Sequence, residues 1–226
     1  MDAEHLTFSV GGSAACTTFG TNVAFPCDTT GKIPARGSGQ AAVVKATWQP
    51  FENLQYYATF GTGRYSLQVA SVSATTSLTG DLPGWIGGAG VRGLLFPESV
   101  VTPALAVDAS VGLERYSFNR SAGQPTAALT SVKDRLDLMR LQLALETSRT
   151  FKVDERWKVE PYGGLKWVRT QVWLKDLDTG SRAGGIHDTV TPYAGVNLPV
   201  SEHESFFGEA SFVNGYEYAA GLTAKF

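Results

Sequence analysis

Apolar and polar side chains alternate at every second position in many stretches of this chain. In the clearest of them, Met139, Leu141, Leu143 and Leu145 alternate with Arg140, Gln142, Ala144 and Glu146. Because side chains of a β-strand point alternately to opposite faces, this stretch is predicted to be a strand with one apolar face and one charged face. A helix would instead scatter Arg140 and Glu146 among the leucines.

The same alternation predicts ten strands, at 5–12, 42–48, 54–65, 85–95, 101–111, 139–145, 157–167, 190–198, 206–212 and 216–226. Long polar stretches follow the first, third, fifth and seventh strands, and we interpret them as loops at 13–37, 66–83, 114–131 and 176–185. Short turns follow the even-numbered strands up to the eighth, and Asn214-Gly215 predicts a hairpin before the last strand. The sequence therefore predicts an antiparallel up-and-down meander with long loops at one end.

The last eleven residues form the most regular strand, with Tyr216, Tyr218, Ala220, Leu222, Ala224 and Phe226 on one face. This stretch resembles the last strand of bacterial outer-membrane β-barrels, which the outer-membrane assembly machinery recognises. Gly221, Leu222 and Phe226 match that assembly signal, whereas Ala219 and Ala224 depart from it. The resemblance to small barrels of this broad class covers nearly the whole chain and implies a ten-stranded transmembrane β-barrel.

Composition agrees with such a barrel and excludes some other classes. Lysine and arginine number 19 and acidic residues 21, for a net charge of -2, so we expect no nucleic-acid partner. The mean hydropathy of -0.07 is typical of a wall that alternates lipid-facing and lumen-facing side chains. No apolar run reaches the roughly 18 residues of a transmembrane helix. Because no leader pattern follows Met1, we expect a mature form whose export signal has been removed.

Two cysteines, Cys16 and Cys27, fall in the predicted loop 13–37. In the periplasm or outside the cell they can form a disulfide, which would stabilise the fold by about 3 kcal/mol in the chain-entropy model. Two reduced thiols remain the alternative. Their spacing is not that of a zinc or redox motif, and we expect no metal and no cofactor.

Strand parity places eleven charged side chains on the face opposite the apolar one, inside the barrel. They are Lys45, Arg92, Asp108, Arg140, Glu146, Lys158, Glu160, Lys166, Glu209, Glu217 and Lys225. Because an unpaired buried charge is costly, we expect these groups to neutralise one another and to plug a narrow lumen.

Three further features of the sequence give expectations about the wall. Pro103, Pro161 and Pro192 fall inside predicted strands, where each lacks a hydrogen-bond donor, so we expect bulges or strand ends there. Leu136 and Leu138 are out of phase with Met139 and Leu141, which predicts another bulge. Aromatic residues gather near strand ends, and two interfacial girdles are predicted. The one on the long-loop side contains Tyr65, Tyr116, Trp173 and Tyr216.

His187 and Asp188 are the residues considered for catalysis, together with Asp176 and Asp178 of the last long loop. Outer-membrane proteases of the omptin type use a His-Asp pair, which this cluster resembles. However, adjacent side chains of a strand point to opposite faces. We therefore interpret these residues as solvated loop residues and expect no enzymatic activity.

The sequence is best interpreted as a single domain, 1–226, in the outer membrane of a Gram-negative bacterium. Eight or twelve strands, or a soluble β-barrel, are the alternative folds. The expected function is surface interaction through extracellular loops, and the alternatives are a narrow pore for small solutes and a hydrolase at the rim. The expected partners are outer-membrane lipid and lipopolysaccharide, the assembly machinery and possible docking proteins of the envelope or cell surface.

Overall fold

The computed structural model describes residues 3–22, 32–70, 75–124, 129–154, 158–178, 180, 182–201, 204–211 and 215–225. Within these ranges the chain forms twelve β-strand segments. They are β1 (Ala3–Asn22), β2 (Lys32–Phe51), β3 (Leu54–Ala70), β4 (Thr75–Thr79), β5 (Gly84–Phe96), β6 (Ala104–Gln124), β7 (Leu129–Ser148), β8 (Phe151–Lys152), β9 (Lys158–Asp176), β10 (Arg182–Pro199), β11 (Glu204–Ser211) and β12 (Gly215–Lys225). The described residues include no helix long and apolar enough to cross a membrane.

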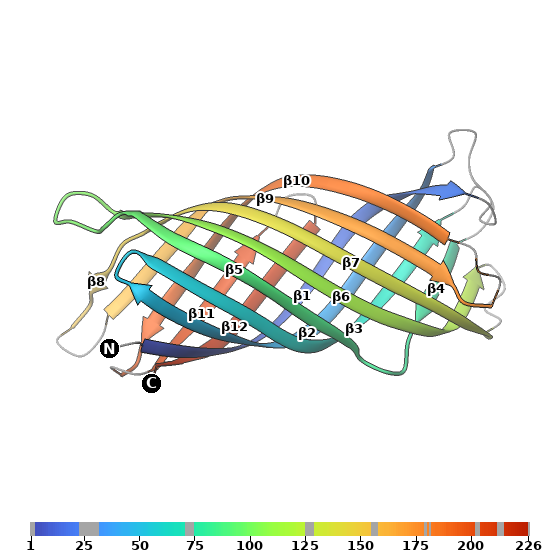
Figure 1. Cartoon of the computed structure of the whole chain (residues 1–226), viewed down its shortest axis with the longest axis horizontal. Coiled ribbons are helices and arrows are strands. Elements are labelled where there is room, and N and C mark those ends of the chain that lie inside the picture. Colours follow the sequence, from blue (N-terminus) through green and yellow to red (C-terminus); the bar gives the residue numbers. More distant parts are fainter. Residues whose placement is uncertain are drawn as a thin grey trace.

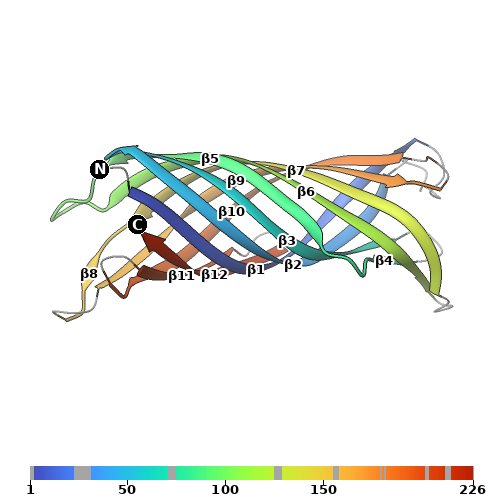
Figure 2. The same cartoon turned by 60° about the horizontal axis from the view of Figure 1, so that its bottom comes forward.

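The strands form one closed antiparallel wall (Figure 1). Neighbours in the chain pair with each other, and β12 returns to β1 with a register from His5 opposite Lys225 to Ala15 opposite Gly215. This last ladder closes the sheet into a barrel, and β1 also pairs with β10 from Gly20 opposite Gly184 to Asn22 opposite Arg182. The start of β1 and the end of β12 lie at the same end of the barrel (Figure 2).

The wall has fewer strand positions than the chain has strand segments, because β4 and β8 do not occupy full positions of their own. β4 and β5 both lie between β3 and β6: β4 pairs with Ser66–Ala70 of β3, and β5 pairs with Leu54–Gly63. They therefore occupy successive parts of one position in the wall. β8 pairs only with Val159 and Lys158, at the start of β9, and lies at the end of the barrel where the termini meet.

The strands are longer than the sequence predicted, which corrects three expected loops. Much of 13–37 belongs to β1 and β2, and parts of 66–83 and 114–131 belong to β3, β4, β6 and β7. The 20 residues of β7 extend for about 65 Å, or about 50 Å along the axis after a tilt of about 40°. The apolar band of an outer-membrane barrel is only about 25 Å tall, so the wall extends well beyond it.

The two faces of the wall lie as the alternation predicts. Leu143 and Leu145 of β7 are 50% and 47% exposed on the outer face. Arg140 and Glu146 lie on the inner face and form ion pairs there. Farther toward the loop end, the outer face carries charged pairs, Arg115 with Asp137 and Arg169 with Asp188. This pattern is that of a lipid-facing band below a water-facing extension.

Pro103, Pro161 and Pro192 lie at or beyond the ends of ladders and not at bulges. Pro103 precedes β6. Pro161 lies one residue beyond the last β7–β9 pair, and Pro192 one residue beyond the last β10–β11 pair. Pro161 and Pro192 therefore each have a ladder partner on one side only, where the missing donor costs little. The register shifts are elsewhere, at Trp48/Phe51, Leu94/Phe96 and Phe118/Arg120.

The bulge predicted at Leu136 and Leu138 is also absent, because the β6–β7 register is continuous through both residues. Both leucines share the inner face with Arg140 and Glu146 and are buried. These leucines differ from their neighbours on the inner face in composition and not in register. The inner face is charged in the half of the barrel nearest the termini and apolar in the other half.

The expected girdles are found in part. Several aromatic side chains lie on the outer face, among them Trp48, Phe51, Phe96, Phe151, Trp173 and Phe206. Tyr65 and Tyr116, however, face the lumen, where their rings stack with centroids 5.1 Å apart. Assigning them to a girdle was wrong. The side chain of Tyr216 lies outside the described residues.

Candidate functional site

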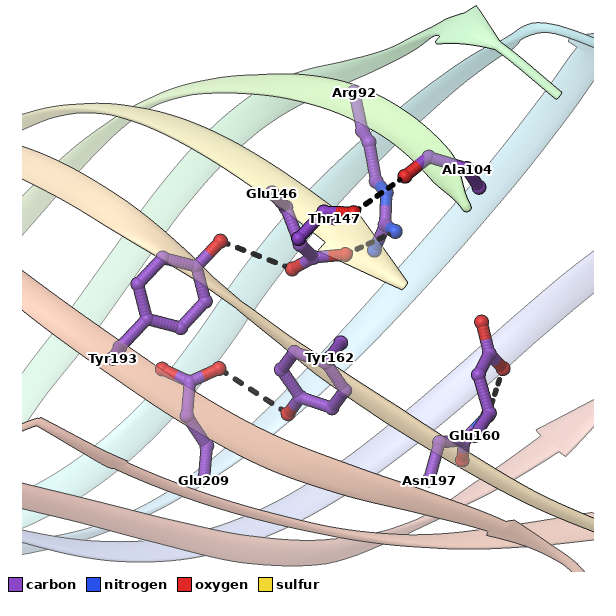
Figure 3. Close-up of polar contacts among 9 residues, drawn as sticks. All are labelled: Arg92, Ala104, Glu146, Thr147, Glu160, Tyr162, Tyr193, Asn197 and Glu209. Carbon is purple, nitrogen blue, oxygen red and sulfur yellow. Dashed lines mark hydrogen bonds and ion pairs between the residues drawn. The ribbon is translucent and has the colours of Figure 1, made fainter. Parts of the chain in front are cut away.

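The lumen contains a polar cavity of about 490 Å³ in the half of the barrel nearest the termini. Its lining comes from opposite sides of the wall and includes Lys45, Thr47, Tyr57, Arg92, Asp108, Glu146, Glu160, Tyr162, Lys166, Tyr193, Asn197, Ser205 and Glu209. Figure 3 shows several of these side chains pointing toward one another from β5, β7, β9, β10 and β11. The cavity is thus lined mainly by hydrogen-bonding and charged groups.

Glu146 of β7 is the centre of one cluster (Figure 3). Its carboxylate forms an ion pair with the guanidinium of Arg92 and accepts a hydrogen bond of 3.1 Å from the hydroxyl of Tyr193. The Glu146 side chain is 13% exposed. A carboxylate this buried is stable in its charged form only when donors surround it, which these two residues provide.

Glu209 of β11 is the centre of a second cluster. It accepts a hydrogen bond of 3.2 Å from Tyr162 Oη, and Lys166 Nζ lies 3.5 Å from its other oxygen. The rings of Tyr162 and Tyr193 meet edge to face, with centroids 6.4 Å apart, and so connect the two clusters. Nearby, the amide of Asn197 donates to Glu160 at 3.1 Å.

Lys45, Tyr57 and Asp108 form a third group, on β2, β3 and β6. Tyr57 donates its hydroxyl proton to Asp108 at 2.8 Å, and Lys45 Nζ lies 3.9 Å from the centroid of the Tyr57 ring. An ammonium group over a ring face gains a modest cation–π stabilisation. Lys45 is therefore held over a ring, within the electrostatic field of Asp108, Glu146 and Glu209.

Glycines on neighbouring strands position two of these tyrosines. A Cβ atom on Gly90 would overlap the ring of Tyr57, and one on Gly195 would overlap the ring of Tyr162. Each tyrosine ring therefore lies flat over the backbone of the next strand, which only a glycine permits. This close approach directs both hydroxyl groups along the wall to their acidic partners.

Buried side chains pack together in the lumen on the loop side of the cavity. Arg140 and Tyr116 both contact Glu114, at 3.2 and 2.8 Å. Beyond them lies an apolar cluster, which we call the plug: Leu67, Leu78, Tyr116, Phe118, Leu136, Leu138, Val172 and Leu174. Leu136 is 0% exposed and Phe118 is 2% exposed. Neighbouring strands from β3 to β9 thus bring closely packed apolar atoms into this half of the lumen, where they disfavour water and ions.

The structure places most of the predicted lumen charges on the inner face. Lys45, Arg92, Asp108, Glu146, Glu160, Lys166 and Glu209 line the cavity, and Arg140 lies above it. Lys158 is an exception, because it is exposed at the start of β9. The side chains of Glu217 and Lys225 lie outside the described residues.

The predicted terminal motifs are only partly described. Gly221 and Leu222 lie in β12, but Phe226 is outside the described residues, so the assembly signal stays a prediction. Cys16 lies in β1 opposite Arg36 of β2, and Cys27 is outside the described residues. The disulfide also stays a prediction.

Parity reasoning considered charges and missed the neutral part of the site. Tyr57, Tyr162 and Tyr193 share the inner face with the predicted charges. The glycines opposite Tyr57 and Tyr162 are the sequence signal that could have identified two of them. The plug was missed because Leu67, Leu78 and Phe118 fall in stretches that were interpreted as loops.

The omptin-like arrangement does not form. Asp188 is on the outer face, where both oxygens accept from Arg169 at 2.8 and 2.9 Å. His187 pairs with Thr170, six residues before Asp176 on β9, which is about 20 Å along the strand. His187 is therefore far from Asp176, and the side chain of Asp188 points to the opposite face of the wall. The described residues hold no cluster of His, Cys, Asp or Glu that could bind a metal ion.

Asp134 lies above the lipid-facing band, opposite Asp176 at the end of the β7–β9 ladder. Burial, and then repulsion from Asp176 and Asp178, raises the pKa of Asp134 from 3.8 to about 6. The folded state therefore holds a proton that the unfolded chain loses, and this contribution to stability is lost as the pH rises from about 4 through 6. Asp134→Asn should flatten the pH dependence of urea unfolding across that window. In a carboxyl NMR titration of the wild type, a midpoint near 4 would contradict the prediction.

No protein family model matches this chain, and no curated protein matches it in sequence. Solved structures do. The translocator domain of the autotransporter NalP from Neisseria meningitidis is similar over 100% of this chain and 89% of its own, with 13% identity and a TM-score of 0.54. The outer membrane protease OmpT from Escherichia coli is similar over 99% and 97%, with 13% identity and a TM-score of 0.56. The transport unit of the autotransporter AIDA-I from Escherichia coli is similar over 98% and 89%, with 8% identity and a TM-score of 0.52.

These similarities show the fold, which is that of bacterial outer-membrane β-barrels. The predicted broad class is confirmed. An outer-membrane location follows from this fold together with the apolar outer face of the wall.

Proposed function

We propose that this chain is a sealed, non-enzymatic outer-membrane barrel that acts through the extracellular end of its wall, in adhesion or in docking to another protein. The wall has ten strand positions in this proposal, with β4 and β5 sharing one of them and β8 lying outside the count. The three similar structures are a translocator domain, a protease and a transport unit. The shared fold therefore does not indicate which function this chain has.

The observation that carries this proposal is the plug. Where the wall leaves the lipid-facing band, its apolar side chains turn inward and its polar side chains turn outward. Arg120 pairs with Asp81 and Lys133 with Asp178 on this outward face. An extension that is packed inside and charged outside is a stiff platform in water, as suits contact with another surface.

A narrow pore is the second candidate, and the polar cavity is the observation that favours it. Charged side chains from several strands line a space of about 490 Å³, and waters or small ions fit there. The plug opposes it, since a conduit needs a continuous polar path through both halves.

Bilayer conductance separates the two candidates. We expect the purified protein to give no ion steps in planar bilayers, because apolar side chains close the lumen. A double variant, Phe118→Ala with Leu136→Ala, removes the bulk of two fully buried plug residues and should produce steps. Equal conductance of the wild type and this variant would contradict a sealed lumen.

Surface interaction requires its own test. Cells that display the barrel should sediment faster by self-association, or should be retained longer on immobilised matrix protein, than vector controls. A barrel whose extension is trimmed by external protease, with its folded gel mobility intact, should lose the effect. Identical behaviour of displaying and control cells in both assays would contradict the interaction role.

A further inference from the structure

The groups of the lumen cavity differ in how well their hydrogen-bonding capacity is met. Each of the four lining carboxylates has a donor within the described wall: Tyr57 for Asp108, Arg92 and Tyr193 for Glu146, Lys166 and Tyr162 for Glu209, and Asn197 for Glu160. Lys45 differs from them. Its ammonium lies over the ring of Tyr57 and forms no ion pair within the described part of the chain, although the charges of Asp108, Glu146 and Glu209 act on it.

A lysine ammonium carries three donors and no acceptor. A ring face stabilises the charge but leaves those N–H groups without lone pairs, and a charge removed from bulk water needs them. Lys45 therefore presents an anion-binding group to the cavity, suited to a carboxylate.

The carboxylates of the lining favour a cationic group on the same ligand. The lining holds three cations, Lys45, Arg92 and Lys166, against the four carboxylates. Asp108 and Glu160 receive hydrogen bonds only from neutral groups, Tyr57 and Asn197, in the described wall. A carboxylate with neutral partners gains a stronger, charge-assisted bond from an ammonium group. The cavity thus suits a ligand with one anionic and one cationic end.

The volume of the cavity and the side from which it opens limit the class of ligand further. A volume of about 490 Å³ is within the range of small-molecule sites, which is roughly 300 to 1,000 Å³. The plug closes the loop side, whereas Ser205, the second residue of β11, brings the cavity lining to the end of the barrel where the termini lie. A ligand would enter from that end.

We propose that the cavity is a dead-end binding site for a short zwitterionic peptide of two or three residues, with the peptide carboxylate on Lys45 and its ammonium on Glu160. This site does not depend on the surface role proposed above. It gives the sealed barrel a receptor pocket that faces the compartment of its termini.

Calorimetric titration in detergent micelles with three probes tests this assignment. Triglycine carries both charges, N-acetyltriglycine lacks the ammonium and triglycinamide lacks the carboxylate. We expect saturable binding of triglycine and at least tenfold weaker binding of each blocked probe. Absence of saturable triglycine binding, or equal binding of all three, would overturn the proposal.

Lys45→Met assigns the carboxylate contact. This variant should bind triglycine and triglycinamide equally weakly, whereas Lys152→Met, a change at the exposed end of β8, should bind as the wild type does. Wild-type affinity in Lys45→Met would contradict the role of Lys45. Heat-modifiable gel mobility shows whether each variant folds, and the comparison of the three probes on the wild type holds even if Lys45→Met does not.

Discussion

Glu146→Ala is expected to lower the free energy of unfolding by about 3 kcal/mol. The change leaves the guanidinium of Arg92 without its partner inside the barrel and removes the acceptor of the Tyr193 hydroxyl. The Arg92 side chain is 38% exposed, so water partly stabilises its charge. We therefore expect a loss of stability at the low end of the range for broken buried ion pairs. Urea unfolding of the barrel in lipid vesicles measures it.

Two further variants decide whether the charge is responsible. Arg92→Met combined with Glu146→Met removes both charges, and should recover most of the loss because no uncompensated charge remains. Glu52→Ala, in the exposed turn between β2 and β3, should be neutral. A double variant as unstable as Glu146→Ala would show that packing, and not charge pairing, is the cause.

Leu136→Ala is expected to cost about 3 kcal/mol. Leu136 is fully buried in the plug, between Tyr116 across the β6–β7 ladder and Leu174 across the β7–β9 ladder. Removal of its methyl groups loses transfer free energy and leaves a cavity that rigid strands cannot close. The same urea unfolding assay applies.

Leu143→Ala is the matched control, on the outer face of the same strand. It loses a similar transfer free energy, but lipid chains fill the space, so no cavity term arises. We expect Leu136→Ala to be more destabilising by at least about 1 kcal/mol. Equal losses would show that the interior of the plug is not packed.

Alternation of side chains was sufficient to predict the membrane part of the barrel. Leu143 and Leu145 face outward and Glu146 faces inward, as the period of two required. Seven of the predicted lumen charges line one cavity for the same reason, since parity alone decides the face. Contacts between particular partners depend on the register, which the sequence does not state.

Beyond the membrane the side chains still alternate, but the apolar ones point inward and the polar ones point outward. This reversal caused the errors in the predicted loops and in the predicted bulge. Leu67 and Leu78 point inward from stretches rich in serine and threonine, which were interpreted as loops. A polar outer face in water carries no apolar marker of a strand. Leu136 and Leu138 looked out of phase for the same reason, although their register is regular.

The reversal of polarity along each strand also sets the immersion depth of the barrel. If the molecule slid outward, Leu143 and Leu145 would lose their hydrocarbon neighbours and meet water. If it slid inward, the ion pairs Arg115–Asp137 and Arg169–Asp188 would enter hydrocarbon. Either displacement is unfavourable, so the wall fixes the depth at which the barrel sits in the bilayer. A thinner or thicker membrane should therefore deform around the barrel before the barrel shifts.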